Sequence, residues 1–363
     1  MKALIAMSGG VDSSVAAKLT KEAGYECIGC TMKLFDADPQ QAEGDSGAGA
    51  NDARKVAESL GMPFHVFDLR EMFRSCVIDS FVDCYARGIT PNPCIECNRY
   101  LKFGKLLQKA DELGCDKIAT GHYARVEQDP ETGKYLLRKG LDASKDQSYV
   151  LYTLTQAQLA RILFPLGGLS KPQVRELAGG EGFANANKSE SQDICFVPDG
   201  DYAAVIRSYA GREFPEGDYV DLDGNVIGKH RGIIHYTIGQ TRGLGQAFGE
   251  KRYVCRIDAD KNQVVLGRNE DVFAQCAKAV NFNWISGEAP EGEIRCRARV
   301  RYNQKEQWAT VRPIKSNGEG RGDAVEIIFD EPQRAITPGQ AAVLYDGDIV
   351  LGGGTIVLFG KQH

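Results

Sequence analysis

The stretch Ala3-Leu4-Ile5-Ala6-Met7-Ser8-Gly9-Gly10-Val11-Asp12-Ser13-Ser14 joins a short apolar run to a glycine-rich turn and then to a helical pattern. Residues 3–7 predict a buried strand, and residues 12–23 predict a helix that ends before Gly24. The two glycines allow the backbone to turn tightly and to approach a ligand, while serine hydroxyls and the first amides of the helix face an anion. This order of strand, turn and helix predicts a phosphate-binding loop.

Strand and helix patterns alternate along the chain from this loop to about residue 205. We expect strands at 26–32, 64–69 and 117–120, helices at 51–60 (capped by Asn51), 70–86 and 100–113, and loops at 36–50 and 90–98. Beyond residue 205, strand-like alternation and Asp-Gly turns dominate. The prediction is an α/β chain: a doubly wound parallel-sheet domain (1–205), a small β-rich central domain (206–275) and a C-terminal β-barrel (276–363).

Composition excludes several classes of protein. Hydrophobic residues make up 42% and charged residues 26%, as in ordinary globular proteins, so collagen-like and disordered chains are excluded. No run approaches the roughly 18 apolar residues that a membrane helix needs, and no signal peptide precedes the first strand. We therefore expect a cytoplasmic protein with no membrane partner.

The net charge of −5 means that any nucleic acid must be bound by a local basic patch. Arg295, Arg297, Arg299 and Arg301 occupy alternate positions in a stretch without acids. On a strand these four side chains share one face, which could follow a phosphate backbone, with Tyr302 placed to stack on a base. A solvated strand face is the alternative.

The eleven cysteines fall into groups with different expected roles. Cys27 and Cys30 lie on a predicted strand and point to opposite faces, which favours core packing. Cys94 and Cys97 lie in Thr90-Pro91-Asn92-Pro93-Cys94-Ile95-Glu96-Cys97-Asn98, where Cys97 is expected next to a helix start that lowers its pKa. A zinc site there would need two more ligands. Cys195 follows the polar run 188–193, and we interpret the remaining cysteines (76, 84, 115, 255, 276 and 296) as packing residues.

The heptapeptide at 8–14 resembles the PP-loop of ATP pyrophosphatases, and no Walker motif occurs. Together with PNPCxxCN (91–98) and KSESQDICF (188–196), the chain resembles the tRNA-specific 2-thiouridylases, which replace O2 of the wobble uridine with sulfur. Further matches include TGHY (120–123), KDQSY (145–149), HYTIGQ (235–240), TPGQ (337–340) and LGGG (351–354), so the resemblance covers nearly the whole chain.

The resemblance implies roles for particular residues. It implies Cys97 as the nucleophile and Cys195 as the carrier of a persulfide. ATP, accompanied by Mg²⁺, would be bound by Ala6, Met7, Ser8, Gly9, Gly10, Val11, Asp12, Ser13, Met32 and Gly121. The target base would meet Asn92, Pro93 and Cys94, and the tRNA would meet His122, Lys145, Asp146, Gln147, Arg301, Tyr302 and Gln340. A cysteine desulfurase or a sulfur-relay protein would donate the sulfur, and AMP and pyrophosphate would be released.

One departure from the family pattern leaves the sulfur chemistry open. Many members carry aspartate at the position of Cys94. Cys94, Cys97 and Cys195 could instead hold a 4Fe–4S cluster that delivers sulfide, although persulfide chemistry is the preferred interpretation. The chain could also be a PP-loop ligase with no use for Cys97 and Cys195, or a non-enzymatic tRNA-binding or iron–sulfur carrier protein. Asp12 could bind Mg²⁺ or cap its helix.

Overall fold

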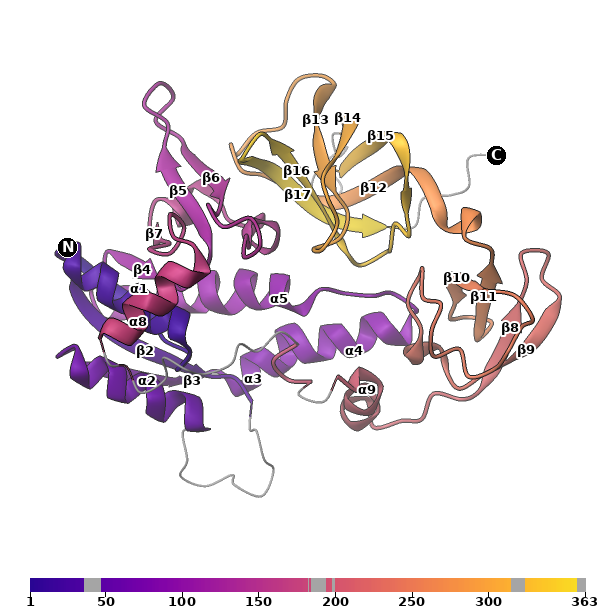
Figure 1. The fold of residues 1–363 in the computed structure, drawn as a ribbon, viewed down its shortest axis with the longest axis horizontal. Helices are drawn as coiled ribbons and strands as arrows, with labels where there is room; N and C mark the ends of the chain where they lie inside the picture. Colours follow the sequence, from indigo (N-terminus) through magenta and orange to yellow (C-terminus); the bar gives the residue numbers. More distant parts are fainter. Residues whose placement is uncertain (36–46, 182, 184–193, 198–199, 315–323, 358–363) are drawn as a thin grey trace.

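The protein folds around three β-sheets (Figure 1), seen in a computed structural model that describes residues 1–35, 47–181, 183, 194–197, 200–314 and 324–357. Within these residues no helix is long and apolar enough to cross a membrane. The first sheet is the expected parallel one, with strand order β3-β2-β1-β4-β7. Its strands are β1 (Lys2–Ala6), β2 (Glu26–Lys33), β3 (Phe64–Asp68), β4 (Lys117–Ala119) and β7 (Ile162–Leu163).

Helices cover both faces of this sheet, which confirms the doubly wound prediction. One face packs against α1 (Val11–Glu22), α2 (Gly47–Ser59) and α8 (Lys171–Gly180), and the opposite face packs against α6 (Leu106–Glu112). Cys27 belongs to the first core and Cys30 to the second, so the two thiols do lie on opposite faces and serve packing. Because parallel sheets are buried on both sides, β1 carries three fully buried side chains in a row.

Two sequence predictions about local structure are wrong. Residues 47–50 belong to α2, so Asn51 lies inside that helix and does not cap it, while residues 36–46 lie outside the described part. The predicted loop at 90–98 becomes helical at α5 (Pro93–Glu96), which continues directly into the π-helix η2 (Cys97–Lys105) and α6. Asn92 caps α5 by accepting from the backbone N–H of Cys94, and a proline suits the first helical position.

The predicted helix at 70–86 is present as a continuous run of α3 (Arg70–Phe73), the π-helix η1 (Arg74–Ile78) and α4 (Asp79–Ala86). The central region is β-rich, as expected, with sheet order β10-β11-β8-β9. Its strands are β8 (Gly217–Val220), β9 (Val226–His230), β10 (Tyr253–Asp258) and β11 (Gln263–Gly267), and the helices α9 (Tyr202–Ala210) and η4 (Ile233–His235) border it.

The C-terminal region closes into the expected barrel, because β12 pairs with both β15 and β17. Its six strands are β12 (Phe273–Trp284), β13 (Ile294–Arg299), β14 (Gln307–Ile314), β15 (Ala324–Arg334), β16 (Ala341–Asp346) and β17 (Ile349–Val357). A hairpin from the N-terminal region, β5 (Ala124–Gln128) and β6 (Tyr135–Lys139), joins this sheet where Arg138 pairs with Ile349. No local sequence pattern indicated this connection.

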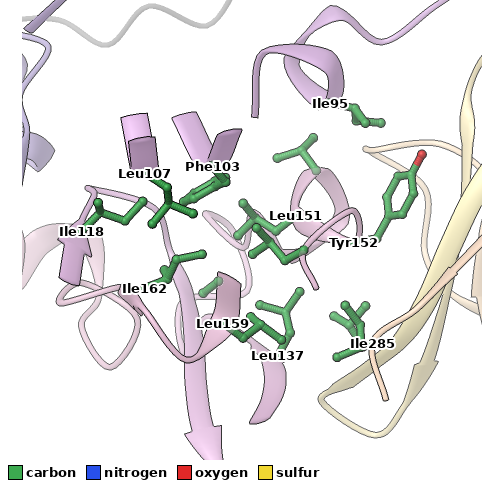
Figure 2. Packing of buried hydrophobic residues seen from close by; sticks show 14 of the residues in the cluster. Ile95, Phe103, Leu107, Ile118, Leu137, Leu151, Tyr152, Leu159, Ile162 and Ile285 are labelled. Carbon is green, nitrogen blue, oxygen red and sulfur yellow. The ribbon is translucent and has the colours of Figure 1, made fainter. Parts of the chain in front are cut away.

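One hydrophobic core links helices of the N-terminal region to the barrel (Figure 2). Phe103 from η2, Leu137 from β6 and Ile285 just after β12 belong to the same cluster. The short helices η3 (Ser148–Leu151) and α7 (Gln156–Leu159) contribute Leu151 and Leu159. The helical run that contains Cys94 and Cys97 therefore shares one core with residues of the barrel.

Candidate functional site

The PP-loop connects β1 to α1 and is held in shape by its own serines. The backbone N–H of Ser8 donates to Ser13 Oγ (3.1 Å), and the Ser13 and Ser14 hydroxyls both donate to the carbonyl of Gly10 (2.9 and 3.1 Å). Gly10 precedes α1 and has no side chain to cap it, so no side chain blocks the helix N-terminus. The N-terminal amides and the positive end of the helix dipole make this end of α1 suited to an anion.

Two glycines let neighbouring segments approach the loop closely. Gly9 adopts a φ of +75°, and a Cβ there would lie 2.1 Å from the carbonyl oxygen of Gly49 in α2. A Cβ on Gly121 would lie 3.0 Å from the backbone nitrogen of Ser13. A side chain at either position would push α2 or the 120–123 segment away from the loop.

A cavity of about 580 Å³ begins at the PP-loop and extends to Cys94 and Cys97. Thirteen of the residues expected in the site line it: Ala6, Met7, Ser8, Asp12, Ser13, Met32, Pro93, Cys94, Cys97, Gly121, His122, Gln147 and Cys195. The PP-loop and thiols that are distant from it in sequence therefore face one shared space.

Cys195 reaches the cavity because the next residue anchors it. Phe196 is buried between the helices that contain Phe73 and Phe81, with ring-centroid distances of 5.7 and 5.3 Å in edge-to-face arrangements. Residues 188–193 of its motif lie outside the described part. Cys94 and Cys195 are exposed, Cys97 is nearly buried, and all three are free thiols.

Burial governs the ionisation of the thiols. Desolvation raises the pKa of Cys195 to about 11, because cavity walls surround the thiol although its surface is accessible. Desolvation also raises the pKa of Cys97, while the nearby Lys102 ammonium acts in the opposite direction. The expected lowering of the Cys97 pKa by a helix start is wrong, because the helix begins four residues earlier, at Pro93, and buries Cys97 in its interior.

Lys102 is a cavity residue that the sequence analysis missed. In the π-helix η2, hydrogen bonds span five residues, so Lys102 lies about one turn from Cys97 on the same side. Its charge lowers the pKa of both Cys97 and Cys195. The five-residue spacing was visible in the sequence, but α-helical geometry would have placed Lys102 on another face.

Among the described residues, no three His, Cys, Asp or Glu side chains converge to hold a metal ion. Asp12 is the only carboxylate among the described residues that line the cavity. Mg²⁺ is commonly bound through one or two carboxylates together with substrate phosphates, so Asp12 and the phosphates of ATP fit a magnesium ion, whereas no complete protein ligand set is formed.

Three family profiles match consecutive parts of the chain: the tRNA methyl transferase HUP domain (1–199), the tRNA methyl transferase PRC-barrel domain (204–268) and the aminomethyltransferase beta-barrel domain (274–356). The tRNA-specific 2-thiouridylase MnmA of Clostridioides difficile is 49% identical over 98% of both chains. The enzyme of the same name from Moorella thermoacetica is 50% identical over 97% of this chain and 98% of its own. The chain belongs to the tRNA-specific 2-thiouridylase family.

Solved structures resemble this chain more weakly. A 4-thiouridine synthetase in complex with RNA and ATP is 18% identical, with a TM-score of 0.34, over 58% of this chain and 50% of that one. The NMN synthetase from Francisella tularensis is 16% identical, with a TM-score of 0.34, over 59% and 79% of the two chains. Neither likeness carries an argument about function.

Two of the residues expected to contact tRNA, His122 and Gln147, lie in the wall of the cavity. His122 packs against Phe103 and Phe164 and shares a hydrogen bond of 2.7 Å with the Thr120 hydroxyl through Nδ1. Burial holds the pKa of His122 well below its usual range, so the imidazole is neutral. Gln147 accepts from the backbone N–H of Tyr123 (3.0 Å).

Asp146 and Lys145 precede Gln147 but differ in environment. The Asp146 carboxylate is buried and accepts from the backbone N–H groups of Gly140 and Ser148 and from the Ser148 hydroxyl. Asp146 therefore holds the backbone at Gly140 and Ser148 by hydrogen bonds from its buried position. Lys145 is partly exposed beside it.

The remaining three expected tRNA contacts lie where domains meet. Arg301 donates to the carbonyl of Ile238 (2.8 Å) in the central region and to the Thr337 hydroxyl (2.7 Å). The Tyr302 hydroxyl donates to the carbonyl of Asp146 (3.2 Å), and its ring packs edge-on against Tyr149. The Gln340 side-chain amide donates to the carbonyls of Thr90 and Pro91, which precede Cys94 and Cys97.

Arg295, Arg297 and Arg299 lie on β13 and alternate with the buried Cys296 and Ala298, as predicted, but the strand ends at Arg299, so the expectation that Arg301 shares this strand face is wrong. The stretch itself holds no acid, but neighbouring segments bring acids to it. Arg295 pairs with Asp330 of β15, and Arg299 pairs with Glu306 (3.4 Å). Arg297 is exposed and lies over the Trp308 ring, 5.1 Å from its centroid.

Proposed function

We propose that this protein uses ATP to replace O2 of the wobble uridine of tRNA with sulfur. The observation that carries the proposal is the shared cavity, which is lined by both the PP-loop and the cysteines Cys97 and Cys195. A PP-loop alone would serve any adenylating enzyme, whereas thiols beside it are what sulfur transfer needs. The relatives that match over nearly their whole length are tRNA-specific 2-thiouridylases, which favours the same reaction over methyl transfer.

The first step activates the uridine. Its O2 attacks the α-phosphorus of ATP, the bond to the β-phosphate breaks, and pyrophosphate leaves. The N-terminus of α1 and the PP-loop amides would stabilise the charge that develops on the departing phosphates. Mg²⁺, held by those phosphates and Asp12, would neutralise part of that charge. The product is a uridine whose C2 carries AMP as a good leaving group.

The second step delivers sulfur from a persulfide on Cys195. The terminal sulfur attacks C2, and AMP departs with the former O2. The Cys97 thiolate then attacks Cys195 Sγ, forms a Cys97–Cys195 disulfide and leaves the sulfur on C2. A dithiol reductant must supply two electrons and two protons to restore the thiols. The persulfide itself would come from a cysteine desulfurase or a sulfur-relay protein.

The cluster route is a second candidate because three thiols share the site. Cys94, Cys97 and Cys195 all line the cavity, and the Cys97 and Cys94 thiolates each oppose ionisation of Cys195, although the three side chains do not converge on one metal position in the described residues. A 4Fe–4S cluster on Cys94, Cys97 and Cys195 would then supply sulfide in place of the persulfide.

The test combines two readouts on the purified protein with unmodified tRNA, Mg-ATP and a persulfide donor. We expect 2-thiouridine in the digested tRNA, measured by mass spectrometry, and AMP formation that depends on tRNA. Cys97→Ser and Cys195→Ser should abolish 2-thiouridine and retain the first adenylation turnover, and Cys276→Ser in the barrel is the matched control. Absence of AMP formation would contradict the adenylation step, and a modified tRNA from the Cys97→Ser, Cys195→Ser double variant would favour a PP-loop ligase.

A further inference from the structure

The acid of the PP-loop is held by two side chains from outside the loop. Asp12 Oδ1 accepts a hydrogen bond from the Tyr123 hydroxyl (2.8 Å) and another from Lys171 Nζ (2.7 Å). Tyr123 is 3% exposed and Lys171 is 7% exposed, whereas the Asp12 side chain is 32% exposed and lines the cavity. Neither Tyr123 nor Lys171 lines that cavity, but each is bound to the cavity residue Asp12.

The Asp12 carboxylate is bound by residues outside α1. Its Oδ1 accepts from Tyr123 and Lys171, both of which are distant in sequence. A buried ammonium is costly without a paired anion, and its removal leaves the carboxylate uncompensated. The position of Asp12 is therefore tied to the positions of Tyr123 and Lys171.

Both residues are also bound to the segment 142–147, which contains the expected tRNA contacts Lys145 to Gln147. Tyr123 exchanges two hydrogen bonds with Gln147, donating its N–H to Oε1 (3.0 Å) and accepting from the Gln147 N–H at its carbonyl (2.9 Å). The backbone N–H of Lys171 donates to Asp142 Oδ2 (2.9 Å).

Asp142 in turn shapes the start of that segment. Its Oδ1 accepts from the N–H (2.9 Å) and the hydroxyl (2.6 Å) of Ser144, and its carbonyl accepts from the N–H of Lys145 (3.0 Å). Two separate connections thus run from one carboxylate oxygen at the PP-loop to the two ends of segment 142–147.

We propose that Tyr123 and Lys171 are positioning residues that couple ATP binding at the PP-loop to tRNA binding at segment 142–147. This inference rests on the proposed function, because it takes tRNA as the ligand of that segment. tRNA that fixes the segment would fix Asp12 through both connections, and the PP-loop would then bind ATP more tightly. By linkage, ATP must strengthen tRNA binding by the same factor.

The test measures the dissociation constant of α,β-methylene-ATP, which cannot be cleaved between its α- and β-phosphates, with and without saturating unmodified tRNA. The coupling ratio is the nucleotide dissociation constant without tRNA divided by the constant with tRNA, and we expect it to be at least about five in the unaltered protein. In Tyr123→Phe and in Lys171→Met the coupling ratio should fall to about two or less, while tRNA affinity without nucleotide stays unchanged. Lys171→Arg, which keeps the charge, should retain part of the ratio.

Matched controls separate coupling from general loss of stability. Tyr219→Phe removes an equally buried hydroxyl bond, to the carbonyl of Leu244 in the central region, and Lys117→Met removes a partly buried ammonium that binds the carbonyl of Ala160. Both should keep the original ratio. The proposal is overturned if tRNA does not change the nucleotide affinity of the unaltered protein, or if Tyr123→Phe and Lys171→Met both keep the original ratio.

The same preparations are assayed for 2-thiouridine. Thiolation without coupling would reject the role of Tyr123 and Lys171 and leave the proposed function standing. Coupling without thiolation would reject the proposed function and support the roles of the two positioning residues.

Discussion

The side-chain amide of Gln340 donates to the carbonyl oxygen of Thr90, 2.9 Å away, although the two residues are 250 positions apart. The same Nε2 lies 3.3 Å from the carbonyl of Pro91, and the backbone N–H of Thr90 donates to the carbonyl of Pro338. Gln340 lies immediately before β16 of the barrel, and Thr90 and Pro91 lead into the helix of the paired cysteines. The barrel therefore fixes the start of the segment that presents Cys94 and Cys97.

Replacing Gln340 by alanine should slow catalysis more than it weakens tRNA binding. Loss of the bonds to Thr90 and Pro91 should lower the free energy of unfolding by about 1 kcal/mol and loosen the cysteine segment. We expect kcat for 2-thiouridine formation to fall while KM for tRNA changes little, as measured by steady-state kinetics. A raised KM with normal kcat would instead indicate that Gln340 acts by direct contact with tRNA.

Replacing Cys94 by aspartate separates the two sulfur routes. A persulfide on Cys195 with Cys97 as nucleophile does not need the Cys94 thiol, so thiolation should stay within about threefold of the original rate. A cluster on three cysteines would lose a ligand, and activity would disappear together with bound iron. Iron and acid-labile sulfide per chain, measured on anaerobically purified protein, decide between the outcomes, and Cys94→Ser checks that the effect is not specific to the added charge.

The sequence predicted those features that depend on one continuous segment. The β1–PP-loop–α1 unit, the opposite faces of Cys27 and Cys30 and the alternation of β13 all follow from local periodicity and agree with the structure. The start of the helix at Pro93 was missed because two prolines and an asparagine are equally typical of a loop and of a capped helix start.

Features that depend on separate segments could not be read in the same way. The acid partners of Arg295 and Arg299 come from β15 and from the turn after β13, and no local pattern in 295–301 reveals them. The binding of Asp12 by Tyr123 and Lys171 joins residues 111 and 159 positions apart, so only the folded chain brings them together. The assignment of PP-loop residues to ATP, and of Cys97 and Cys195 to sulfur transfer, rests on family resemblance and not on periodicity.

Alkylation of Cys195 by iodoacetamide should be slow at neutral pH and rise with pH. Its pKa is raised to about 11 by desolvation, and only the thiolate reacts. Below that pKa the thiolate fraction grows about tenfold for each pH unit, so the rate should increase steadily up to about pH 11. Peptide mapping by mass spectrometry after timed alkylation measures the rate at this one residue.

Lys102→Met should slow this reaction further at every pH below the plateau. Removal of the ammonium takes away an influence that lowers the pKa of Cys195, so the pKa should rise and the thiolate fraction at a given pH should fall. Lys105→Met, at the far end of η2, is the control because Lys105 binds Gln108 and does not line the cavity. An unchanged rate in Lys102→Met would show that Lys102 does not act on Cys195.

Neutralising the exposed arginines of β13 should weaken tRNA binding in a salt-dependent manner. Arg297 lies over Trp308 on the exposed face, and Arg295 lies on the same ring at 5.4 Å while pairing with Asp330. Each arginine that contacts a phosphate adds about one unit to the slope of log affinity against log salt. Arg297→Gln should therefore reduce the slope by about one, and Arg295→Gln by less, because Asp330 already neutralises that charge.

Arg312→Gln on β14, where Glu293 and Glu326 pair with the guanidinium, is the control and should leave the slope unchanged. Filter binding between low and moderate salt measures all three, and equal slopes throughout would show that this face does not bind tRNA.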